Sequence, residues 1–418
     1  MADATEEPAK PVKEKLTSYQ RRLLVFLSVA TFFEGYDFLA LAQILPNLRD
    51  DMGLPVEAGG FIVGSINVGT ILAFWIVRRA DVWGRARVLT ITIAGYTVTT
   101  FLSGFAPDVY TFIALQLIAR IFLLGEWAVS MMIAAEEFPA SRRGFAIGVV
   151  QACSSLGSIF CAGVVPLLLK TDYGWRSVYF VAVIPLVILA FARRNLKETE
   201  RFTASQASGE KAENLFAIWK TPYAKRVLML AAIWFVAYIP AQNAIAFWKD
   251  FAVNERGLTD GQVGAAISIA AVAAMPLLFA VGWLIDKLGR RRGAALIFSV
   301  GGAGLVGCYT LHGFVPLTAA LVFGIFSASA YLPVLNAYSS ELFPTKWRGA
   351  GFAWSNNLLG RLGYVAGPYV VGLVVAQTGL LGPVVASTAA FNVIAIVLVY
   401  AFLPETTGRE LEETSVAH

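Results

Sequence analysis

The sequence predicts an all-α membrane protein in which twelve transmembrane helices form two six-helix bundles. Of the 418 residues, 57% are hydrophobic and only 15% are charged, and the mean hydropathy is +0.66. A soluble domain carries about 25% charged residues, so this composition places most of the chain in a bilayer. Apolar runs of about twenty residues, the length that crosses the hydrocarbon core, recur in two sets of six. A long-range repeat then relates the two sets to each other.

The apolar runs define the expected order of elements. After a polar tail at 1–21, six helices are expected at 23–46, 58–78, 88–106, 109–134, 143–168 and 176–193. After a polar linker at 194–225, six more are expected at 226–249, 261–284, 293–312, 315–338, 349–376 and 380–402. The expected domains are therefore a tail (1–21), a bundle (22–193), a linker (194–225), a second bundle (226–403) and a C-terminal tail (404–418).

The basic residues are distributed unevenly between the two sides of the membrane. If the N-terminus is cytoplasmic, the tails and the loops on that side hold 26 of the 33 Lys and Arg residues. Because cytoplasmic loops carry an excess of Lys and Arg, both termini are expected in the cytoplasm. The predicted location is the plasma or inner membrane of the cell, with multiple passes. The formal charge of +5 then requires no nucleic-acid partner.

Two charged motifs occur once in each half at one constant offset. The stretch 81–85 recurs at 286–290, which is 205 positions later. The stretch 136–143 recurs at 341–348, again 205 positions later. Parallel six-helix repeats predict two related bundles with the substrate site between them. The charged residues of these motifs are Asp81, Arg85, Glu136, Arg143, Asp286, Arg290, Glu341 and Arg348.

These motif charges fall at the predicted ends of helices that correspond in the two halves. Isolated surface ion pairs contribute only about 0–1 kcal/mol, so inert surface pairs remain one interpretation. Their symmetric placement favours gating contacts that break and re-form. Each half also ends in a Glu-Thr pair, at 198–199 and at 405–406, for which the sequence indicates no role.

Two carboxylates lie inside the first apolar run. Glu34 and Asp37 are three positions apart and therefore share a helix face. A charge at the centre of a bilayer costs about 2.5–3.5 kcal/mol on insertion scales, and such residues usually face a bundle interior or a water-filled path. The spacing indicates a proton or substrate site. The alternative is a pair that only holds helices together.

The fourth apolar run adds Arg120 and Glu126. Six positions rotate a helix by about 240°, so these two residues do not share a face. Arg120 is expected to pair with Asp37 or Glu34, and an arginine beside an acid favours the charged form of that acid. Asp37 is therefore the predicted carrier of a coupling proton, with Glu126 as the alternative carrier. A fixed structural ion pair between Asp37 and Arg120 remains a competing interpretation.

Arg361 lies deep in the eleventh apolar run. Asn357 precedes it by four residues and Tyr364 follows it by three, so all three share a helix face. The planar guanidinium binds a carboxylate through two hydrogen bonds. A substrate-carboxylate clamp is predicted, with a permanent ion pair to an acid of another helix as the alternative.

Other polar and aromatic residues are spaced along single helix faces. They could line the cavity, or they could serve helix–helix hydrogen bonding and packing. The fifth run carries a stripe of Gln151, Ser154, Ser155 and Ser158. The further candidate substrate contacts are Tyr36, Gln151, Trp234, Tyr238, Gln242 and Tyr331.

The loop after the eighth run carries a family signature. Gly282, Asp286, Lys287, Gly289, Arg290 and Arg291 match Gly-x-x-x-Asp-(Arg/Lys)-x-Gly-Arg-(Arg/Lys), and on this basis the chain resembles the major facilitator superfamily over nearly its whole length. The first half departs at Val77, Val82 and Ala86. In the family this loop forms charge contacts that hold the cytoplasmic side closed in the outward-open state.

Two shorter segments resemble one branch of that superfamily. The element from Glu34 to Asp37 is similar to the Asp-Gly-x-Asp element of proton-coupled aromatic and organic acid symporters, with Glu in place of the first Asp. The segment from Arg120 to Trp127 looks like the Arg…Gly-Glu-Trp segment of metabolite–proton symporters. The resemblance implies a monomeric carrier whose partners are a small molecule, protons and the lipid bilayer.

We therefore expect a secondary active transporter that moves a small organic anion with protons by alternating access. The anion is expected to be a carboxylate, with or without an aromatic ring. One alternative is a sugar or polyol–proton symporter, which would use Gln242, Asn243, Asn336 and the tryptophans. The other is an antiporter of organic cations or drugs, which would use the acids directly. A transporter-like membrane sensor is a further alternative from a different class.

An enzyme is not expected. The sequence contains no Gly-x-x-x-x-Gly-Lys-(Ser/Thr), His-Glu-x-x-His or Gly-x-Ser-x-Gly motif. Only two histidines are present, and the three cysteines all fall in apolar runs. Neither a metal site nor a cofactor is therefore expected.

Overall fold

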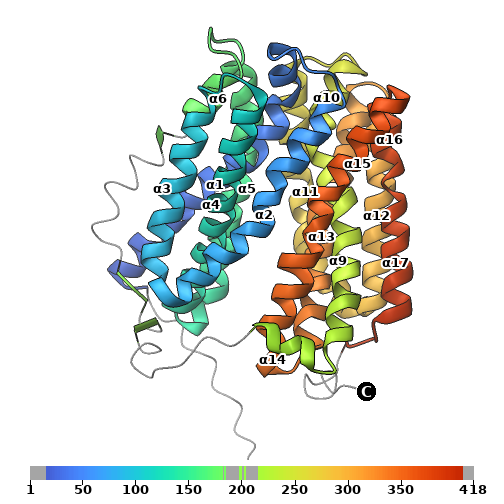
Figure 1. The fold of residues 1–418 in the computed structure, drawn as a ribbon. Coiled ribbons are helices and arrows are strands. Elements are labelled where there is room, and N and C mark those ends of the chain that lie inside the picture. Colours follow the sequence, from blue (N-terminus) through green and yellow to red (C-terminus); the bar gives the residue numbers. More distant parts are fainter. Residues whose placement is uncertain (1–15, 182, 185–196, 200–201, 204–214, 408–418) are drawn as a thin grey trace, which may run out of the picture.

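Two groups of long helices lie side by side (Figure 1). The computed structural model describes residues 16–181, 183–184, 197–199, 202–203 and 215–407. The first group consists of α1 (Ser18–Asp51), α2 (Ala58–Trp83), α3 (Arg85–Ser103), α4 (Val109–Glu137), α5 (Ala140–Leu168) and the short α6 (Arg176–Phe180). Within this group α1 packs on α5, and α4 packs on α2 and α3.

The second group follows a short 3-10 helix, η2 (Leu215–Lys220). Its members are α9 (Ala224–Ala246), α10 (Trp248–Asn254), α11 (Asp260–Leu288), α12 (Arg290–Thr310), α13 (Phe314–Glu341), α14 (Thr345–Phe352), the π-helix η3 (Ala353–Gly360), α15 (Leu362–Thr378), α16 (Leu381–Ser387) and α17 (Ala390–Phe402). In this group α13 packs on α11 and α12, and α9 packs on η3 and α15.

The all-α membrane class predicted from the sequence is confirmed. Among the described residues, ten helices are long and apolar enough to cross a membrane. The helix α3 is not one of these ten, although it runs beside α4 (Figure 1). The sixth expected span, 176–193, begins with α6, and most of its remainder lies outside the described residues. The count of twelve spans therefore stays a prediction.

The ends of several helices follow from local sequence. Thr17 and Gln20 form a capping box at the start of α1, and Thr259 and Gln262 form one at the start of α11. Gly84 and Gly289 separate α2 from α3 and α11 from α12 with φ of 98° and 86°. Only glycine adopts such angles without strain, so these turns are built from the motif glycines.

Three of the expected continuous spans are interrupted. The span predicted at 226–249 breaks at Phe247, between α9 and α10, and the hydroxyl of Tyr309 donates to the carbonyls of Asn243 and Ala244 there. The span at 349–376 contains the π-helix η3. The span at 380–402 divides into α16 and α17.

Within the described residues, the two bundles pack most closely at one end. In Figure 1 the ribbons meet at the end that carries α10 and α16 and diverge toward the end that carries α14. At the closed end α2 packs on α15, α5 on α11 and α1 on α10. A methyl group on Gly60 would lie 2.7 Å from the Cα of Gly372, so α2 and α15 are in backbone contact there. We call this the outer end and the opposite one the inner end.

The buried apolar side chains form three clusters, which follow the same division between the two ends. One cluster lies within each bundle at the inner side. A third cluster combines residues of both bundles, among them Leu45 of α1, Phe247 at the break after α9 and Val371 of α15. Because burial of apolar surface is the main favourable term in packing, the outer end is where the bundles stabilise each other.

Candidate functional site

The two carboxylates of α1 are buried and have different environments. Glu34 is 5% exposed, and its Oε2 accepts a hydrogen bond of 2.7 Å from the hydroxyl of Ser154 on α5. Asp37 is 8% exposed, and neither of its oxygens has a hydrogen-bond partner within the described chain. Buried polar groups are normally paired, and exceptions concentrate at functional positions. Of these two carboxylates, only Glu34 is therefore bonded to a neighbouring helix within the described residues.

The expected ion pair of Arg120 is not formed. Arg120 is 6% exposed, and no ion pair joins it to Asp37 or Glu34 in the part of the chain that the structure describes. Its guanidinium lies 5.1 Å from the centre of the Phe38 ring. A cation over a ring face is attracted by the ring quadrupole, so Arg120 is held against α1 beside the carboxylates rather than bonded to them.

Glu126 is enclosed within its own bundle. Its side chain is fully buried, and Oε1 accepts a hydrogen bond of 2.7 Å from Ser130, one turn further along α4. Its Oε2 and the hydroxyl of the buried Tyr96 have no hydrogen-bond partner among the described residues. The role of Glu126 as the alternative proton carrier stays a prediction.

Arg361 reaches across to the other bundle. Its Nη1 donates a hydrogen bond of 3.0 Å to the carbonyl of Thr70 on α2. Beside it, the amide of Asn67 donates to the carbonyl of Tyr364 at 3.0 Å. No ion pair of Arg361 occurs in the described residues. The permanent Arg–acid pair considered above is therefore absent there, and a neutral carbonyl holds the guanidinium instead.

The π-helix changes which asparagine meets the neighbouring helix. Within η3 the N–H of Arg361 donates to the carbonyl of Asn356, five residues earlier. Asn356 is 4% exposed and accepts a hydrogen bond of 3.0 Å from the hydroxyl of Tyr238. Asn357, which ordinary helical spacing places with Arg361, is only half-buried. The α-helical spacing expected from the sequence therefore selected Asn357 and missed Asn356. The physical reason is that η3 has the wider i→i+5 turn of a π-helix.

Four aromatic rings from α9, α13 and α15 form a cluster next to Asn356. Tyr238 stacks on Trp234 at 5.3 Å between ring centres and lies 4.3 Å from the ring centre of Tyr364. Tyr331 meets Trp234 and Tyr238 edge-on. Trp234, Tyr238 and Tyr331 are each at most 3% exposed. In this arrangement they pack against one another, and Tyr364 is the ring next to Arg361 in the chain.

Three other predicted contacts differ in their exposure. Tyr36 is 1% exposed, and its hydroxyl donates to the carbonyl of Val178, so it packs in the core of its bundle here, and its role as a substrate contact stays a prediction. Gln151 is exposed and accepts from the indole N–H of Trp127. Gln242 is half-buried.

The polar stripe of α5 is used for helix–helix contact at two of its positions. Ser154 donates to Glu34, and Ser158 donates to the carbonyl of Gly35 at 2.8 Å. Both acceptors are on α1. For these two serines the structure therefore favours helix–helix hydrogen bonding over cavity lining.

The motif charges form one cluster in each bundle at the inner end. In the first bundle Arg85 pairs with Asp81 at 3.1 Å and with Glu136 at 3.2 Å. The carboxylate of Glu198 accepts from the backbone N–H of Arg85 at the start of α3, at 2.7 Å. The Glu-Thr pair continues the cluster, because Thr199 donates to Glu136.

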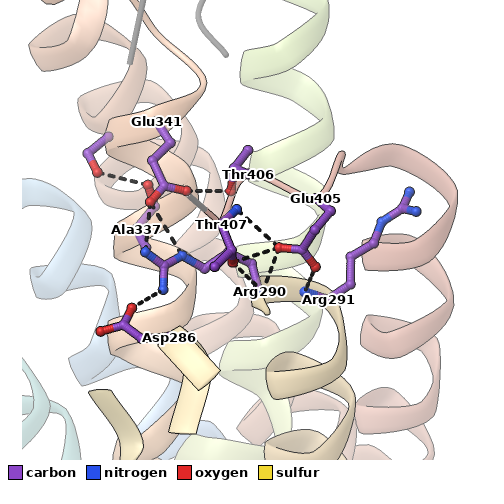
Figure 2. A network of polar contacts seen from close by, with 9 residues as sticks. Asp286, Arg290, Arg291, Ala337, Glu341, Glu405, Thr406 and Thr407 are labelled. Carbon is purple, nitrogen blue, oxygen red and sulfur yellow. Dashed lines mark hydrogen bonds and ion pairs between the residues drawn. The ribbon is translucent and has the colours of Figure 1, made fainter. Parts of the chain in front are cut away.

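The second bundle repeats this arrangement (Figure 2). Arg290 pairs with Asp286 at 2.6 Å and with Glu341 at 3.0 Å, and Thr406 donates to Glu341. Glu405 accepts from the backbone N–H groups of Arg290 and Arg291 at the start of α12. Carboxylates are stabilised at helix N-termini, which gives the Glu-Thr pairs the role that the sequence left open.

The ionisation of Glu405 reflects these contacts. Partial burial opposes its charged form, but hydrogen bonds from Thr407 and from the backbone N–H groups of Arg291 and Arg290 outweigh that effect. They hold the pKa of Glu405 below its ordinary value. The carboxylate is therefore charged at neutral pH.

Each ion-pair cluster stays within one bundle. In contrast to Arg85 and Arg290, the two remaining motif arginines form no ion pair with a described residue. Arg348 donates to the carbonyl of Ser340 at 3.0 Å, and the Nε of Arg143 has no hydrogen-bond partner there. The gating role of all eight motif charges stays a prediction, because the ion pairs that these charges form with described residues all lie inside one bundle.

Comparison with known proteins decides the family. The chain matches the sequence model of the Major Facilitator Superfamily over residues 27–368 and again over 235–417. The protein belongs to the Major Facilitator Superfamily. It is a multi-pass membrane transporter of small molecules and not an enzyme, as its sequence predicted.

Several curated relatives carry names that concern organic acids. The chain is 28% identical to a probable 4-methylmuconolactone transporter of Cupriavidus pinatubonensis, covering 92% of this chain and 90% of the relative. It is 24% identical to the niacin transporter NiaP of Acinetobacter baylyi, covering 93% and 95%. It is also 24% identical to a gallate transporter of Pseudomonas putida, covering 86% and 87%.

Solved structures share the fold at low identity. The inward-open xylose transporter XylE from E. coli superposes with a TM-score of 0.72 at 19% identity, covering 94% of this chain and 98% of that one. An inward-facing bacterial homologue of the human lysosomal transporter Spinster gives 0.74 at 14% identity, covering 93% and 97%. These matches confirm the major facilitator fold.

Proposed function

We propose that this transporter moves a small organic acid together with protons by alternating access. The observation that carries the proposal is the half-buried Arg361, which donates to a neutral carbonyl and pairs with no acid of the described chain. The relatives named above for niacin, gallate and 4-methylmuconolactone, together with a cis,cis-muconate transport protein of Acinetobacter baylyi that is 24% identical, support an organic acid as the cargo.

Arg361 would bind the carboxylate of the substrate. Its Nη1 is used by Thr70, but its Nε has no hydrogen-bond partner in the described residues. Nε and Nη2 lie on the same edge of the guanidinium, and a carboxylate can accept two parallel hydrogen bonds from that edge. Asn356 and Tyr364 flank the arginine, so the body of the acid would rest against them.

Binding there would also change the contact between the bundles. The Thr70 carbonyl belongs to α2, and Arg361 belongs to the opposite bundle. A carboxylate on Nε and Nη2 would leave the bond from Nη1 to Thr70 in place but would partly neutralise the guanidinium, which would weaken that charge-assisted bond to the carbonyl. A ligand shifts a conformational equilibrium only through contacts that differ between the two states, and this weakening would supply such a difference.

Asp37 would carry the coupling proton. It is buried, and in the described chain it accepts no hydrogen bond, while Glu34 is occupied by Ser154. Arg120 is the cation whose field acts on Asp37. When the substrate anion or a bundle movement changes that field, the affinity of Asp37 for a proton changes with it. Glu34 and Glu126 are the alternative carriers.

The arrangement described here would be the inward-facing one. The inner end carries most of the Lys and Arg residues outside the spans, which favours the cytoplasm. The bundles are in contact at the outer end and diverge at the inner end (Figure 1). Movement of one bundle against the other would close the inner end and bring the two Arg-centred clusters toward each other as gates. A monomer suffices for this cycle.

Uptake into proteoliposomes tests the proposal. Aromatic and aliphatic carboxylates are offered with and without an inward proton gradient to the wild type, Arg361→Ala and Asp37→Asn. The proposal expects gradient-driven accumulation of an acid, its loss in Arg361→Ala, and exchange without accumulation in Asp37→Asn. The matched control is Arg256→Ala, because Arg256 also donates to a carbonyl, that of Leu311, but lies at the outer surface.

Three results would each contradict one part of the proposal. Full acid transport by Arg361→Ala would leave this arginine with a structural role only. Competition by sugars or by organic cations, without competition by acids, would replace the acid with one of the alternative cargoes. Intact gradient-driven accumulation by Asp37→Asn would move the proton to Glu34 or Glu126.

A further inference from the structure

A buried ion pair joins the two bundles at the outer end. Nη2 of Arg49, near the end of α1, lies 2.7 Å from Oδ1 of Asp250 on α10. The side chains are 2% and 1% exposed. Next to this pair, Nζ of Lys249 donates to Oδ1 of Asn47 on α1 at 3.0 Å. Two consecutive residues of α10 thus hold two polar residues of α1.

This contact differs from the other ion pairs of the described chain. Arg85 and Arg290 pair only with acids of their own bundles, and Arg176 pairs with Asp51 inside the first bundle. Lys249 pairs with Asp260 inside the second bundle. Within the described residues, the bond between Arg49 and Asp250 is the ion pair that crosses from one bundle to the other.

Each member of this buried ion pair depends on the other to compensate its charge. Asp250 Oδ2 and Arg49 Nε have no other hydrogen-bond partner in the described chain, although Asn254 also donates to Asp250 Oδ1 at 2.7 Å. Removing one member of a buried ion pair leaves the other as an uncompensated buried charge, which is strongly destabilising. In a carrier that can open at this end, the remaining charge regains water when the bundles separate. Loss of either partner therefore favours the open outer end.

We propose that Arg49 and Asp250, supported by the bond from Lys249 to Asn47, form a latch that holds the outer end shut. Breaking this latch is the step that opens the substrate path on that side. The latch is separate from the clusters around Arg85 and Arg290, which lie at the inner end. The inference rests on the proposed alternating access, but it concerns the balance between the two arrangements and not the identity of the cargo.

Distances between spin labels test the latch without any substrate. Labels are attached to cysteines introduced at Asp172 and Gln377, which are exposed at the outer end of opposite bundles. The native cysteines Cys153, Cys161 and Cys308 are replaced by alanine beforehand. Double electron–electron resonance in liposomes then reports how often the outer end is open. Asp250→Asn and Arg49→Gln are each expected to raise the ratio of long to short distances by at least about tenfold.

The chain offers a matched control at the same end. Asp51→Asn removes an ion pair of 2.6 Å to Arg176, but both residues belong to the first bundle. The latch predicts wild-type distances for this variant. The double variant R49D/D250R restores opposite charges across the bundles and is expected to return the distances toward those of the wild type.

Three results would overturn the latch. These are wild-type distances in both Asp250→Asn and Arg49→Gln, an equal shift in Asp51→Asn, and wild-type distances in Asn47→Ala. Asn47→Ala removes only the supporting bond and is expected to shift the distances less, so it decides the matter if the charge variants do not fold. Folding is checked by gel filtration and circular dichroism. Uptake assays decide the cargo separately, so failure of the latch and failure of the acid proposal are distinguishable.

Discussion

A methyl group at Gly35 has no space at the crossing of α1 and α5. It would lie 2.6 Å from the carbonyl carbon and 2.9 Å from the Cα of Ser154, and closer still to the carbonyl oxygen. Non-bonded carbon atoms pack at about 3.5–4.0 Å. Because a backbone cannot rotate away as a side chain can, we expect Gly35→Ala to separate the two helices by about 1 Å.

That separation has two energetic consequences. The hydrogen bond from Ser154 to Glu34 would lengthen from 2.7 Å to about 3.7 Å, which is outside hydrogen-bond range. Its loss costs about 0.5–1.5 kcal/mol, and overpacking costs about 1–3 kcal/mol. The better helix propensity of alanine returns about 1 kcal/mol. The net loss of stability is therefore expected to be about 0.5–3.5 kcal/mol.

Thermal unfolding of the purified protein in detergent, followed by tryptophan fluorescence, measures this loss. The matched control is Gly163→Ala on α5, because a methyl group added at Gly163 would meet no neighbouring atom within 4 Å. The control is expected to be neutral or stabilised by up to about 1 kcal/mol. Equal melting temperatures for Gly35→Ala and the wild type, or equal losses in both variants, would refute the reasoning.

Two further predictions concern single hydrogen bonds, and a third concerns the ionisation of Glu405. Tyr238→Phe keeps the ring contacts but removes the 3.0 Å bond to Asn356, so thermal unfolding should show a loss of about 1 kcal/mol. Tyr369→Phe removes a 2.6 Å bond to Ser65 in the other bundle, and spin-label distances should shift toward an open outer end. The lowered pKa of Glu405 means that its charged form stabilises the fold at neutral pH. This contribution is lost as the pH falls through the folded-state pKa of Glu405. That pKa lies below the ordinary glutamate value of about 4.3. Glu405→Gln should therefore flatten the acid end of a plot of melting temperature against pH, and an unchanged plot would contradict this assignment.

The features that the sequence predicted best depend on local spacing. Asp286 and Arg290 are four residues apart across a glycine turn, so their pairing follows from the chain itself. The apolar runs likewise predicted the fold class, because run length alone decides whether a helix can cross the membrane. The repeat of these features in both halves then indicated two bundles, and the described helices bear that out.

The features that the sequence predicted poorly depend on how helices rotate against each other. Whether Arg120 meets Asp37 or the ring of Phe38 is decided by a few ångströms of packing, which helical spacing does not specify. In the same way, helical spacing does not specify that the hydroxyl of Tyr36 donates to the carbonyl of Val178. The latch between Arg49 and Asp250 joins residues 201 positions apart and leaves no mark in either segment.

The π-helix at Ala353–Gly360 has a consequence for comparing sequences. A wide turn of this kind accommodates about one residue more than an α-helical turn over the same rise. Relatives that lack the wide turn would therefore align with this protein only if one position is skipped within the segment. An alignment without that gap would assign the place of Asn356 to Asn357 and would shift every residue before it against its true counterpart. Substrate determinants carried over from such relatives should be matched by position in space before they are matched by column.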